Sequence, residues 1–392
     1  MVEWKKIDDV ILSLKTGLNP RANFVLNTPE SKIPYITGKD IFENRINVTD
    51  KTDMIDDKAL SLINKRACLE DNLLLFASTG TGTVGRMAIV DKYNYDWGMS
   101  ETLYASKTKD YITPYFLMYC LYSNNIKSQF EPKISKGSVP HLKVVDLLKV
   151  QIPIPSLQEQ ERIVGILDTF TSSIDNLKQQ IAQRRKQYEY YRDQLLDLEG
   201  KERVAIVPLR EVVKSYCTGA TPNKGHLEYY ESGTIPWLRT QDVKFNEIYE
   251  IDSFVTEEAV AKTGVKWIPS NCVIVAISGA TAGRCAINKI PTTTNQHCLN
   301  LEINPKKALY KYIYYCVYNA YSDMVSRKQG ARGDLNSSII LGITIPVPSL
   351  SEQQRIVDIL DKFEASIQNL EAQLSQREKQ YEYYRNKLLT FE

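Results

Sequence analysis

Two long stretches of the chain carry apolar residues at alternating steps of three and four positions. In the first stretch, 152–199, the apolar series begins at Ile163 and ends at Leu198, and in the second stretch, 345–392, it begins at Ile356. Such a repeat averages 3.5 residues and is typical of the seam of a coiled coil. The pattern therefore predicts two long amphipathic helices whose apolar seams can pair with each other.

The two stretches are copies of one sequence. A constant shift of 193 positions aligns 48 residues without a gap, and 31 of them are identical. Each copy opens on a Pro-x-Pro that blocks helix formation, followed by a serine, Ser156 or Ser349. A glutamate comes three residues later, Glu159 or Glu352, which completes the pattern of a capping box. Matching helix starts and matching seams indicate an internal duplication.

One polar position interrupts each seam at the equivalent place, Arg184 in the first copy and Arg377 in the second. Parallel helices in register would bring these arginines together inside the seam, where like charges cost stability. Antiparallel pairing separates them, so we expect an antiparallel pair. At about 1.5 Å per residue, the roughly 41 residues of each helix give a rod of about 60 Å, which suits a spacer. The alternative is two amphipathic helices that each pack on their own domain.

The segments that precede the two helices also share a frame. Residues 33–41 are similar to 235–243, and 85–89 are similar to 283–287. Short apolar runs, each followed by a Gly/Thr/Ser turn and a second apolar run, predict hairpins. The first strands of these hairpins are expected at 73–77 and 273–277, and aromatic-rich helices at 114–122 and 309–318.

These patterns predict an α+β protein with an internal pseudo-two-fold duplication, in which two globular domains are joined by two long helices that form an antiparallel coiled coil. The short polar sequence at 200–204 is the natural boundary between the halves. The predicted divisions are a first globular domain at 1–151, a first spacer helix at 152–199, a second globular domain at 200–344 and a second spacer helix at 345–392.

Composition places the chain among ordinary globular proteins, with 43% hydrophobic and 24% charged residues out of 392. The amino-terminal residues form no apolar signal core, and no run of 18 apolar residues occurs, so we expect a cytoplasmic protein that does not contact a membrane. The seven cysteines form no C-x-x-C motif, which fits a reducing compartment. Although His297 and Cys298 are adjacent, no second ligand pair has metal-site spacing, and no metal site is expected.

The charge distribution is more informative than the net charge of +2. The first globular segment has 20 Lys and Arg against 18 Asp and Glu, and the second has 17 against 13, whereas each helix has 6 against 8. A mild basic excess on the globular segments suits a polyanionic ligand there.

A glycine-rich turn at 80–85 matches the G-x-G-x-x-G pattern of dinucleotide-binding proteins. A strand-like run follows the turn in place of a helix whose N-terminus could hold a pyrophosphate, so nucleotide binding is not expected. Backbone N–H groups, hydroxyls and the neighbouring Arg86 could instead contact DNA phosphates or base edges, and a plain hairpin turn is the alternative. The chain also lacks the common motifs of hydrolases, metalloproteases and adenine methyltransferases, and we expect it to be non-catalytic.

Several of these motifs together resemble the specificity subunit of type I restriction-modification enzymes. Each globular segment is entered by I-P-[YW]-[IL]-x-x-x-D-[IV], and each is left through a short segment at 137–142 or 330–335. The P-S-L-x-E-Q-x-x-I-V helix start then follows twice. The two exit segments differ, because Asp334 stands where the first copy has His141.

The resemblance implies two target recognition domains, each reading one half of a bipartite site in double-stranded DNA. It further implies that the chain scaffolds DNA adenine methyltransferase subunits, which carry S-adenosylmethionine, and restriction subunits, which are translocase-nucleases that use ATP and Mg. No cofactor is expected in this chain itself. Two alternatives stay open: a specificity module of another type of restriction-methylation enzyme, and a coiled-coil interaction protein with no DNA role.

Paired loops of the two globular segments supply the candidate DNA contacts, because they occupy equivalent places and carry the basic excess. The candidates are Lys39, Thr79, Thr81, Arg86, Lys136 and Ser138 in the first segment, and Arg239, Gln241, Ser278, Thr281, Arg284 and Arg332 in the second. Tyr190 and Tyr383 lie off the seams near the helix ends, so we predict that they contact a partner subunit. Packing against the chain's own globular domain is the alternative.

Overall fold

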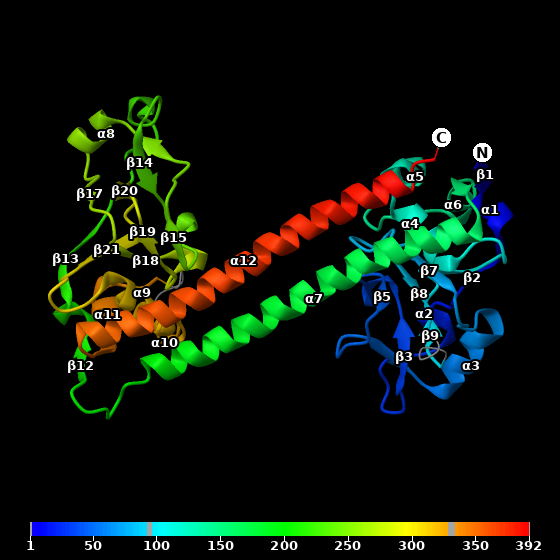
Figure 1. The fold of residues 1–392 in the computed structure, drawn as a ribbon, viewed down its shortest axis with the longest axis horizontal. Helices are drawn as coiled ribbons and strands as arrows, with labels where there is room; N and C mark the ends of the chain where they lie inside the picture. The colour runs from blue at the N-terminus through cyan, green and yellow to red at the C-terminus, as the bar shows by residue number, and fades with distance from the viewer. Residues whose placement is uncertain (1, 92–95, 328–333, 392) are drawn as a thin grey trace. The chain divides into compact units, whose positions relative to one another are not determined.

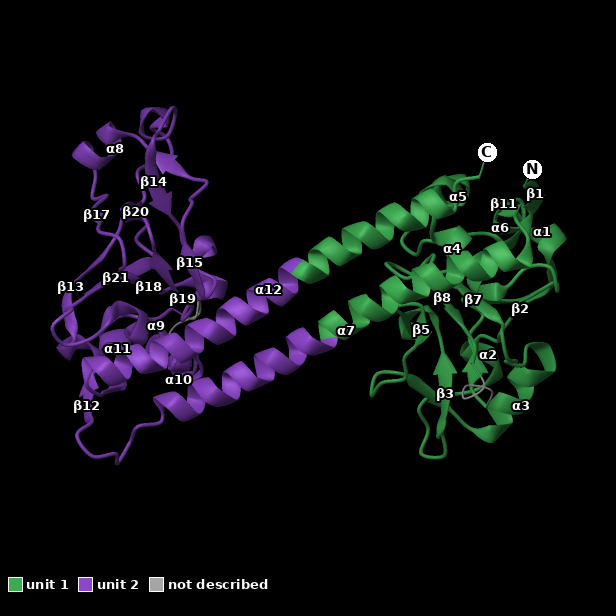
Figure 2. Ribbon diagram, viewed as in Figure 1, with its two compact units in different colours: residues 1–178, 373–392 green, residues 179–372 purple. Residues whose placement is uncertain are grey.

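The computed structural model describes residues 2–91, 96–327 and 334–391. It divides into two compact units, unit 1 with residues 1–178 and 373–392 and unit 2 with residues 179–372 (Figure 2). Each unit contains one globular part and a segment of each long helix, α7 (Leu157–Leu196) and α12 (Leu350–Leu388) (Figure 1). None of the helices formed by the described residues is long and apolar enough to cross a membrane.

Unit 1 is built on a four-stranded antiparallel sheet in the order β2-β10-β7-β8. Its strands are β2 (Ile11–Thr16), β7 (Leu74–Ala77), β8 (Met87–Ile89) and β10 (Leu103–Thr108). A second sheet contains β6 (Asp53–Ile55), β3 (Ile33–Ile36) and β9 (Gly98–Met99). Two further pairs of strands are separate: β4 (Ile41–Phe42) pairs with β5 (Arg45–Ile46), and β1 (Glu3–Lys6) pairs with β11 (Gln151–Ile154). The helices are α1 (Ile7–Val10), α2 (Pro20–Asn23), α3 (Asp57–Arg66), α4 (Pro114–Tyr122), α5 (Asn124–Phe130) and α6 (Val144–Leu148), with the 3-10 turns η1 (Gly38–Asp40) and η2 (Glu131–Lys133).

Unit 2 repeats this plan with small changes. Its main sheet has the order β13-β21-β18-β19-β15, with strands β13 (Val213–Thr218), β15 (Asn246–Ile248), β18 (Val273–Ala276), β19 (Cys285–Asn288) and β21 (Cys298–Ile303). A second sheet joins β16 (Phe254–Val255), β14 (Ile235–Leu238), β20 (Thr292–Thr294) and β17 (Trp267–Ile268), and β12 (Ala205–Pro208) pairs with β22 (Thr344–Val347). The helices are α8 (Glu257–Lys262), α9 (Tyr310–Asn319), α10 (Tyr321–Ser326) and α11 (Ser337–Leu341), with the 3-10 turns η3 (Leu209–Glu211), η4 (Leu227–Tyr229), η5 (Thr240–Asp242) and η6 (Gly279–Thr281).

The predicted hairpins and aromatic helices are confirmed in both units. Strand β7 pairs with β8, and β18 pairs with β19, both antiparallel across the predicted turns. Helices α4 and α9 lie where the aromatic-rich patterns placed them, and their tyrosines and phenylalanines are largely buried. These side chains therefore belong to the hydrophobic core, which is the usual place for aromatic rings with a large apolar surface.

Antiparallel pairing of the long helices is confirmed within each unit. In unit 2, Arg185 of α7 bonds to Glu371 of α12, whereas the later residue Tyr188 bonds to the earlier residue Glu364. In unit 1, Ile163 and Leu167 near the start of α7 share one apolar cluster with Leu389 at the end of the chain. The two helical segments of each unit therefore run in opposite directions.

The seam arginines each lie over a phenylalanine ring of the other helix. The guanidinium carbon of Arg184 is 5.9 Å from the ring centre of Phe363, and that of Arg377 is 5.7 Å from the ring centre of Phe170. Tyr191 and Tyr384 also contact the other helix, where they stack on Phe363 and Phe170, and they stay 46% and 40% exposed. A tyrosine keeps its hydroxyl hydrated by lying at the edge of an apolar seam.

The serine caps form as predicted, but the capping boxes are only half complete. The Ser156 and Ser349 hydroxyls accept hydrogen bonds from the N–H groups of Glu159 and Glu352, at 3.4 and 3.3 Å. The glutamate side chains form ion pairs with the arginine three residues further on, which takes them away from the helix start. An i, i+3 pair on the helix surface competes with the second bond of the box.

A buried glutamine anchors each long helix to its own globular part. Gln160 accepts a hydrogen bond from the Thr113 N–H at 2.9 Å and donates to the Tyr111 carbonyl at 2.9 Å. Gln353 makes the same pair of bonds with the Leu309 N–H, at 2.9 Å, and the Lys307 carbonyl, at 3.3 Å. Both glutamines are fully buried, so these bonds offset the cost of removing the amide from water.

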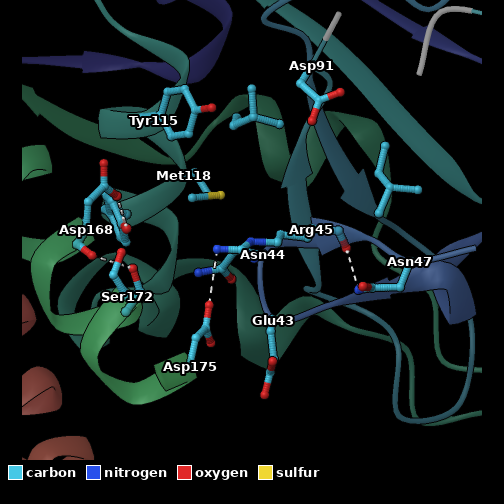
Figure 3. Close-up of a pocket in the computed structure, with 14 residues that line it drawn as sticks. Glu43, Asn44, Arg45, Asn47, Asp91, Tyr115, Met118, Asp168, Ser172 and Asp175 are labelled. Atoms are coloured by element: carbon cyan, nitrogen blue, oxygen red, sulfur yellow. Dashed lines mark hydrogen bonds and ion pairs between the residues drawn. The ribbon is translucent and has the colours of Figure 1, made fainter. Parts of the chain in front are cut away.

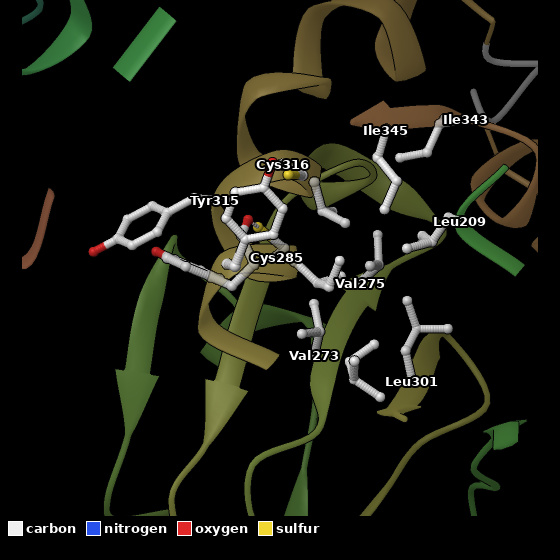
Figure 4. Close-up of a cluster of buried hydrophobic side chains, with 14 of the residues drawn as sticks. Leu209, Val273, Val275, Cys285, Leu301, Tyr315, Cys316, Ile343 and Ile345 are labelled. Carbon is white, nitrogen blue, oxygen red and sulfur yellow. Dashed lines mark hydrogen bonds between the residues drawn. The ribbon is translucent and has the colours of Figure 1, made fainter. Parts of the chain in front are cut away.

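The helices also complete the apolar cores. The large core of unit 2 joins its main sheet and α9 to Tyr188 of α7 and to Ile356 and Leu360 of α12. Figure 4 shows part of this cluster, with Val273 and Val275 on the sheet below α9. The corresponding core of unit 1 includes Ile163 and Leu167 of α7. Each globular part therefore shares its apolar core with residues of both long helices.

Candidate nucleic-acid interface

The glycine-rich turn of unit 1 is a tight loop between two strands, as the sequence predicted. Gly80, Gly82 and Gly85 have φ angles of 126°, 72° and 87°, a region that favours glycine. The chain continues into β8, so no helix N-terminus stands behind the turn. The turn exposes Thr81 to solvent. The turn therefore has the strand–turn–strand arrangement that the sequence predicted.

The exit segment lies beside this turn. The Thr79 hydroxyl and His141 Nδ1 are 2.7 Å apart, and the two residues form an isolated β-bridge. The Gly80 N–H donates to the Pro140 carbonyl at 3.0 Å. Lys136 and Ser138 of the exit segment are exposed. The candidates Thr79, Thr81, Lys136 and Ser138 thus lie in one region of unit 1. His141 contacts the turn through Thr79.

The 3-10 turn η1 is the third element of this region. A Cβ on Gly38 would lie 3.1 Å from the Ala77 Cβ and 3.2 Å from the Thr83 hydroxyl oxygen, so η1 packs against the glycine-rich turn. Lys39 is exposed on η1 and forms an ion pair with Asp53 at 2.7 Å. Burial raises the pKa of the Asp53 carboxyl, but the bonds from Lys39 and Asn27 outweigh it and leave that pKa below its ordinary value.

Arg86 is less available than the sequence suggested. Its guanidinium donates to the carbonyl of Ile41 in β4, at 3.1 Å, and the residue is partly buried. This bond ties the turn to the neighbouring strand. The remaining N–H groups of the guanidinium are those that could reach a ligand.

Unit 2 places its candidates on equivalent elements. Ser278 stands at the N-cap position of η6 without a side-chain capping bond, and Thr281 and Arg284 follow in the same turn, all partly buried. The Leu335 N–H donates to the Ile277 carbonyl at 2.8 Å, as the Leu142 N–H donates to the Ser78 carbonyl in unit 1. Arg332 lies outside the described residues.

The last two candidates lie on η5, which is the counterpart of η1. Gln241 is exposed and occupies the position of Lys39. Arg239 occupies the position of Thr37, and its backbone N–H donates to the Asp242 carboxylate at 2.8 Å. In unit 1, the Thr37 N–H makes the same bond to Asp40, at 2.9 Å. The same local capping therefore presents different side chains in the two units.

A polar pocket lies where the globular part of unit 1 meets α7 (Figure 3). It has a volume of about 400 Å³, and Figure 3 shows Arg45 reaching Asp175 of the helix, at 3.1 Å. On another wall of the pocket, the Tyr119 hydroxyl donates to Asp168 at 2.5 Å. These bonds join the small β4–β5 hairpin and α4 to the helix, so they hold the globular part in place.

Unit 2 has a pocket at the equivalent place. There Lys311 bridges Glu247, at 3.0 Å, and Asp361, at 2.9 Å, and the Tyr315 hydroxyl donates to Asp361 at 2.6 Å. Burial lowers the pKa of Lys311, but its two carboxylate partners outweigh it and raise that pKa above its ordinary value. The two junctions use different ion pairs around a shared Tyr–Asp bond.

The predicted partner residues are exposed in the same way in both units. Tyr190 and Tyr383 are 61% and 58% exposed. Each stands edge-on to the next tyrosine, with ring centres 5.3 and 5.2 Å apart. Tyr191 and Tyr384 in turn stack on Phe363 and Phe170, both at 5.4 Å and 27°. Each unit therefore carries one aromatic ladder, formed by Phe363, Tyr191 and Tyr190 in unit 2 and by Phe170, Tyr384 and Tyr383 in unit 1.

Within residues 2–91, 96–327 and 334–391, no group of three or more His, Cys, Asp or Glu side chains could hold a metal ion. The described cysteines are all free thiols, and burial raises the pKa of Cys272 to about 12. A buried thiol with a raised pKa is mostly protonated at neutral pH, so Cys272 is a weak nucleophile.

Comparison with known proteins agrees with these motifs. A family described as the type I restriction modification DNA specificity domain matches residues 1–184 and again 201–378. The chain belongs to this family. The specificity subunit of the Escherichia coli type I restriction enzyme EcoR124I/EcoR124II is 36% identical over 258 residues, which cover 62% of this chain and 63% of that protein. A putative type I specificity subunit of Haemophilus influenzae is 25% identical over 414 residues, covering all of this chain and 96% of that protein.

Solved structures of the same class share the fold. The S subunit of a type I restriction-modification system from M. genitalium aligns over 100% of this chain and 97% of that chain, with a TM-score of 0.61 and 16% identity. The HsdS subunit of Thermoanaerobacter tengcongensis aligns over 99% of this chain and 95% of that chain, with a TM-score of 0.50 and 16% identity. The predicted fold class, two globular parts and two long antiparallel helices in an α+β chain, is confirmed. As a type I DNA specificity protein, the chain is a recognition component, which agrees with the predicted non-catalytic role.

Proposed function

We propose that the chain recognises a bipartite, asymmetric site in double-stranded DNA, with one half-site read by each globular part. The observation that carries this proposal is the repetition of one loop arrangement with different side chains. Lys39 is replaced by Gln241 at the same place, and Thr37 by Arg239. Equivalent loops that carry different donors would read different bases, because direct readout depends on the donors and acceptors presented to the groove.

The exposure and charge of the loops support a DNA ligand. Thr81, Lys136 and Ser138 are exposed in unit 1, and Gln241 is exposed in unit 2. Hydroxyls, amides and cations of this kind make most phosphate and base contacts in protein–DNA interfaces. The basic excess of the globular segments would add a salt-dependent, sequence-independent attraction.

Substitution of the loop arginine Arg284 by alanine tests the proposal. We expect DNA binding by the full chain to weaken by about 1 to 3 kcal/mol, preferentially for the specific site if Arg284 reads a base and evenly across sequences if it holds a phosphate. Fluorescence anisotropy with specific and unrelated duplexes at several salt concentrations measures both quantities. Lys262→Ala on α8 is the matched control, since Lys262 is exposed and already paired with Glu258 at 2.7 Å.

The assignment fails if the affinity of the chain for DNA is unchanged in Arg284→Ala, in Arg332→Ala and in alanine variants of the other ten candidate residues. A loss in the Lys262→Ala control equal to that in Arg284→Ala would assign the effect to net charge alone.

We further propose that the chain scaffolds the enzyme subunits: DNA adenine methyltransferase subunits, which would supply S-adenosylmethionine, and restriction subunits, which would supply ATP and Mg. The two aromatic ladders are the proposed contacts for the methyltransferase. Their geometry is the same in both units, and exposed tyrosines beside an arginine are common at the centres of interfaces.

Substitution of Tyr190 and Tyr383 by alanine tests the partner contact. Each change should lower the affinity for the methyltransferase subunit about fivefold or more and leave the melting temperature nearly unchanged, because both rings are more than half exposed. Analytical ultracentrifugation of the mixed subunits reports the affinity. Tyr216→Ala, at a 56% exposed tyrosine on β13, is the control. Full assembly by the Tyr190→Ala/Tyr383→Ala double variant would rule out the ladders as the contact.

A further inference from the structure

A pocket in unit 2 has no role in the fold described above. Its volume is about 380 Å³, and it lies between the loop after β13 and strands β14 and β16. The lining residues are Lys224, Leu227, Tyr230, Trp237, Arg239, Ser253 and Phe254. This volume is within the range of small-ligand sites in proteins.

The walls of the pocket are aromatic. Tyr230 stands edge-on to Trp237, with ring centres 6.0 Å apart and an angle of 66°. The polar ends of both rings are already satisfied, because the Trp237 indole N–H donates to the Ala220 carbonyl at 3.1 Å and the Tyr230 hydroxyl donates to the Pro222 carbonyl. Phe254 is 42% exposed. The pocket therefore offers ring surfaces, which suit a flat aromatic ligand.

Two cations border these rings without a carboxylate partner. Among the described residues, neither Lys224 nor Arg239 forms an ion pair, whereas Lys39 at the corresponding turn of unit 1 is paired with Asp53. The guanidinium carbon of Arg239 lies 6.0 Å from the ring centre of Trp237, and its buried Nε has no hydrogen-bond partner within the described structure. The combination of ring surfaces with unpaired cations points to a flat ligand that carries negative charge.

We propose that this pocket holds one unstacked nucleotide of a DNA strand, with its base against Tyr230, Trp237 and Phe254 and its phosphate near Lys224 and Arg239. The inference rests on the proposed DNA recognition and adds a ligand geometry to it. Aromatic side chains stack on any base, and nearby cations hold the strand. The turn η5 supports the assignment to DNA, since it carries both Arg239 and the exposed Gln241. Unit 1 has Thr37 in place of Arg239, so the site belongs to unit 2.

The test compares two DNA duplexes whose sequences are the same except at one position. One duplex is fully paired, and the other carries a single unpaired 5-iododeoxyuridine, a photoreactive base that crosslinks to aromatic side chains on which it stacks. The full chain should bind the duplex with the unpaired base about fivefold or more tightly, which corresponds to the lower end of measured base stacking. Irradiation followed by peptide mass spectrometry should place the crosslink on Tyr230, Trp237 or Phe254.

Four variants make the test specific. Phe254→Ala and Lys224→Ala should bring the ratio of the two affinities toward one. Trp267→Ala, at a 50% exposed ring outside the pocket, and Lys262→Ala should leave the ratio as in the unaltered chain.

Equal affinity for the two duplexes, or crosslinks only at other residues, would overturn the pocket assignment while the paired duplex still reports DNA binding. Displacement of the crosslink by millimolar dAMP without loss of duplex binding would assign the pocket to a free nucleotide and also overturn the proposal. Failure of the chain to bind either duplex would contradict the proposed DNA recognition itself.

Discussion

Glu364 is a half-buried carboxyl group that lines the pocket between α12 and the globular part of unit 2, beside tyrosines of the core. The Tyr188 hydroxyl donates to it at 3.1 Å, and Tyr314 and Tyr315 are buried nearby. Burial raises the pKa of Glu364 above its ordinary value, although the tyrosine hydrogen bonds and Lys311 act in the opposite direction. The equivalent residue of unit 1 is Thr171, so this half-buried carboxyl group is confined to one copy.

Glu364→Gln should stabilise the protein above pH 7. The folded-state pKa of Glu364 is raised, so the folded chain binds more protons than the unfolded chain between the two pKa values, and stability falls as the pH rises through that window. The amide can still accept from Tyr188 and carries no charge. Thermal melts should show a higher melting temperature for the variant at pH 8, by about 2 to 4 °C for each kcal/mol of added stability. This increase should shrink as the pH is lowered toward 4. Glu378→Gln, at an exposed site on α12, is the control, and an equal gain at both pH values would refute the titration.

Predictions about single residues were confirmed where neighbouring residues in the sequence determine the structure. The serine caps follow from the Pro-x-Pro-Ser pattern alone. Gln160 and Gln353 lie inside the quoted E-Q motif but received no role, because their partners are backbone groups 44 to 49 residues away in sequence. Their repetition within an apolar helix face was the signal that could have identified them. The pocket around Trp237 had no such signal, since its lining comes from three separate segments.

At the scale of elements, the predicted caps Ser156 and Ser349 located the starts of the two helices, which begin at Leu157 and Leu350, and the apolar repeat predicted that both helices are long. The apolar repeat and the interrupting arginines were sufficient for the antiparallel pairing, because both depend on spacing. The half-exposed positions of Tyr191 and Tyr384 could not be derived in this way. A heptad position does not report how far a large ring extends past the seam.

We expect the length of the two long helices to set the distance between the two globular parts. One heptad inserted into each helix, after Lys178 and after Ala372, keeps both seams continuous and adds about 10 Å. We expect the unspecified spacer of the methylated motif to lengthen by roughly one to three base pairs, or activity to be lost because the added pairs rotate the groove, with both half-sites unchanged. Methylation mapping measures the spacer. A folded, active variant with its original spacer would show that other elements set it.

At the scale of the whole molecule, the duplication organises the chain. The family match is repeated in the two halves, and each unit combines a globular part with one segment of each long helix. The sequence was sufficient for this plan because 31 identical positions expose the repeat directly. The base sequence that each half would read depends on loop geometry and bound DNA, which no spacing pattern encodes.

Mapping of adenine methylation in cells that express this chain with a DNA methyltransferase subunit, the proposed partner, tests the central claim most directly. The proposed function predicts one motif of two different half-sites separated by an unspecified spacer. Replacement of residues 1–150 by the corresponding domain of a relative should change one half-site and leave the other as it was. A continuous motif, or a replacement that alters both half-sites, would contradict independent reading by the two globular parts.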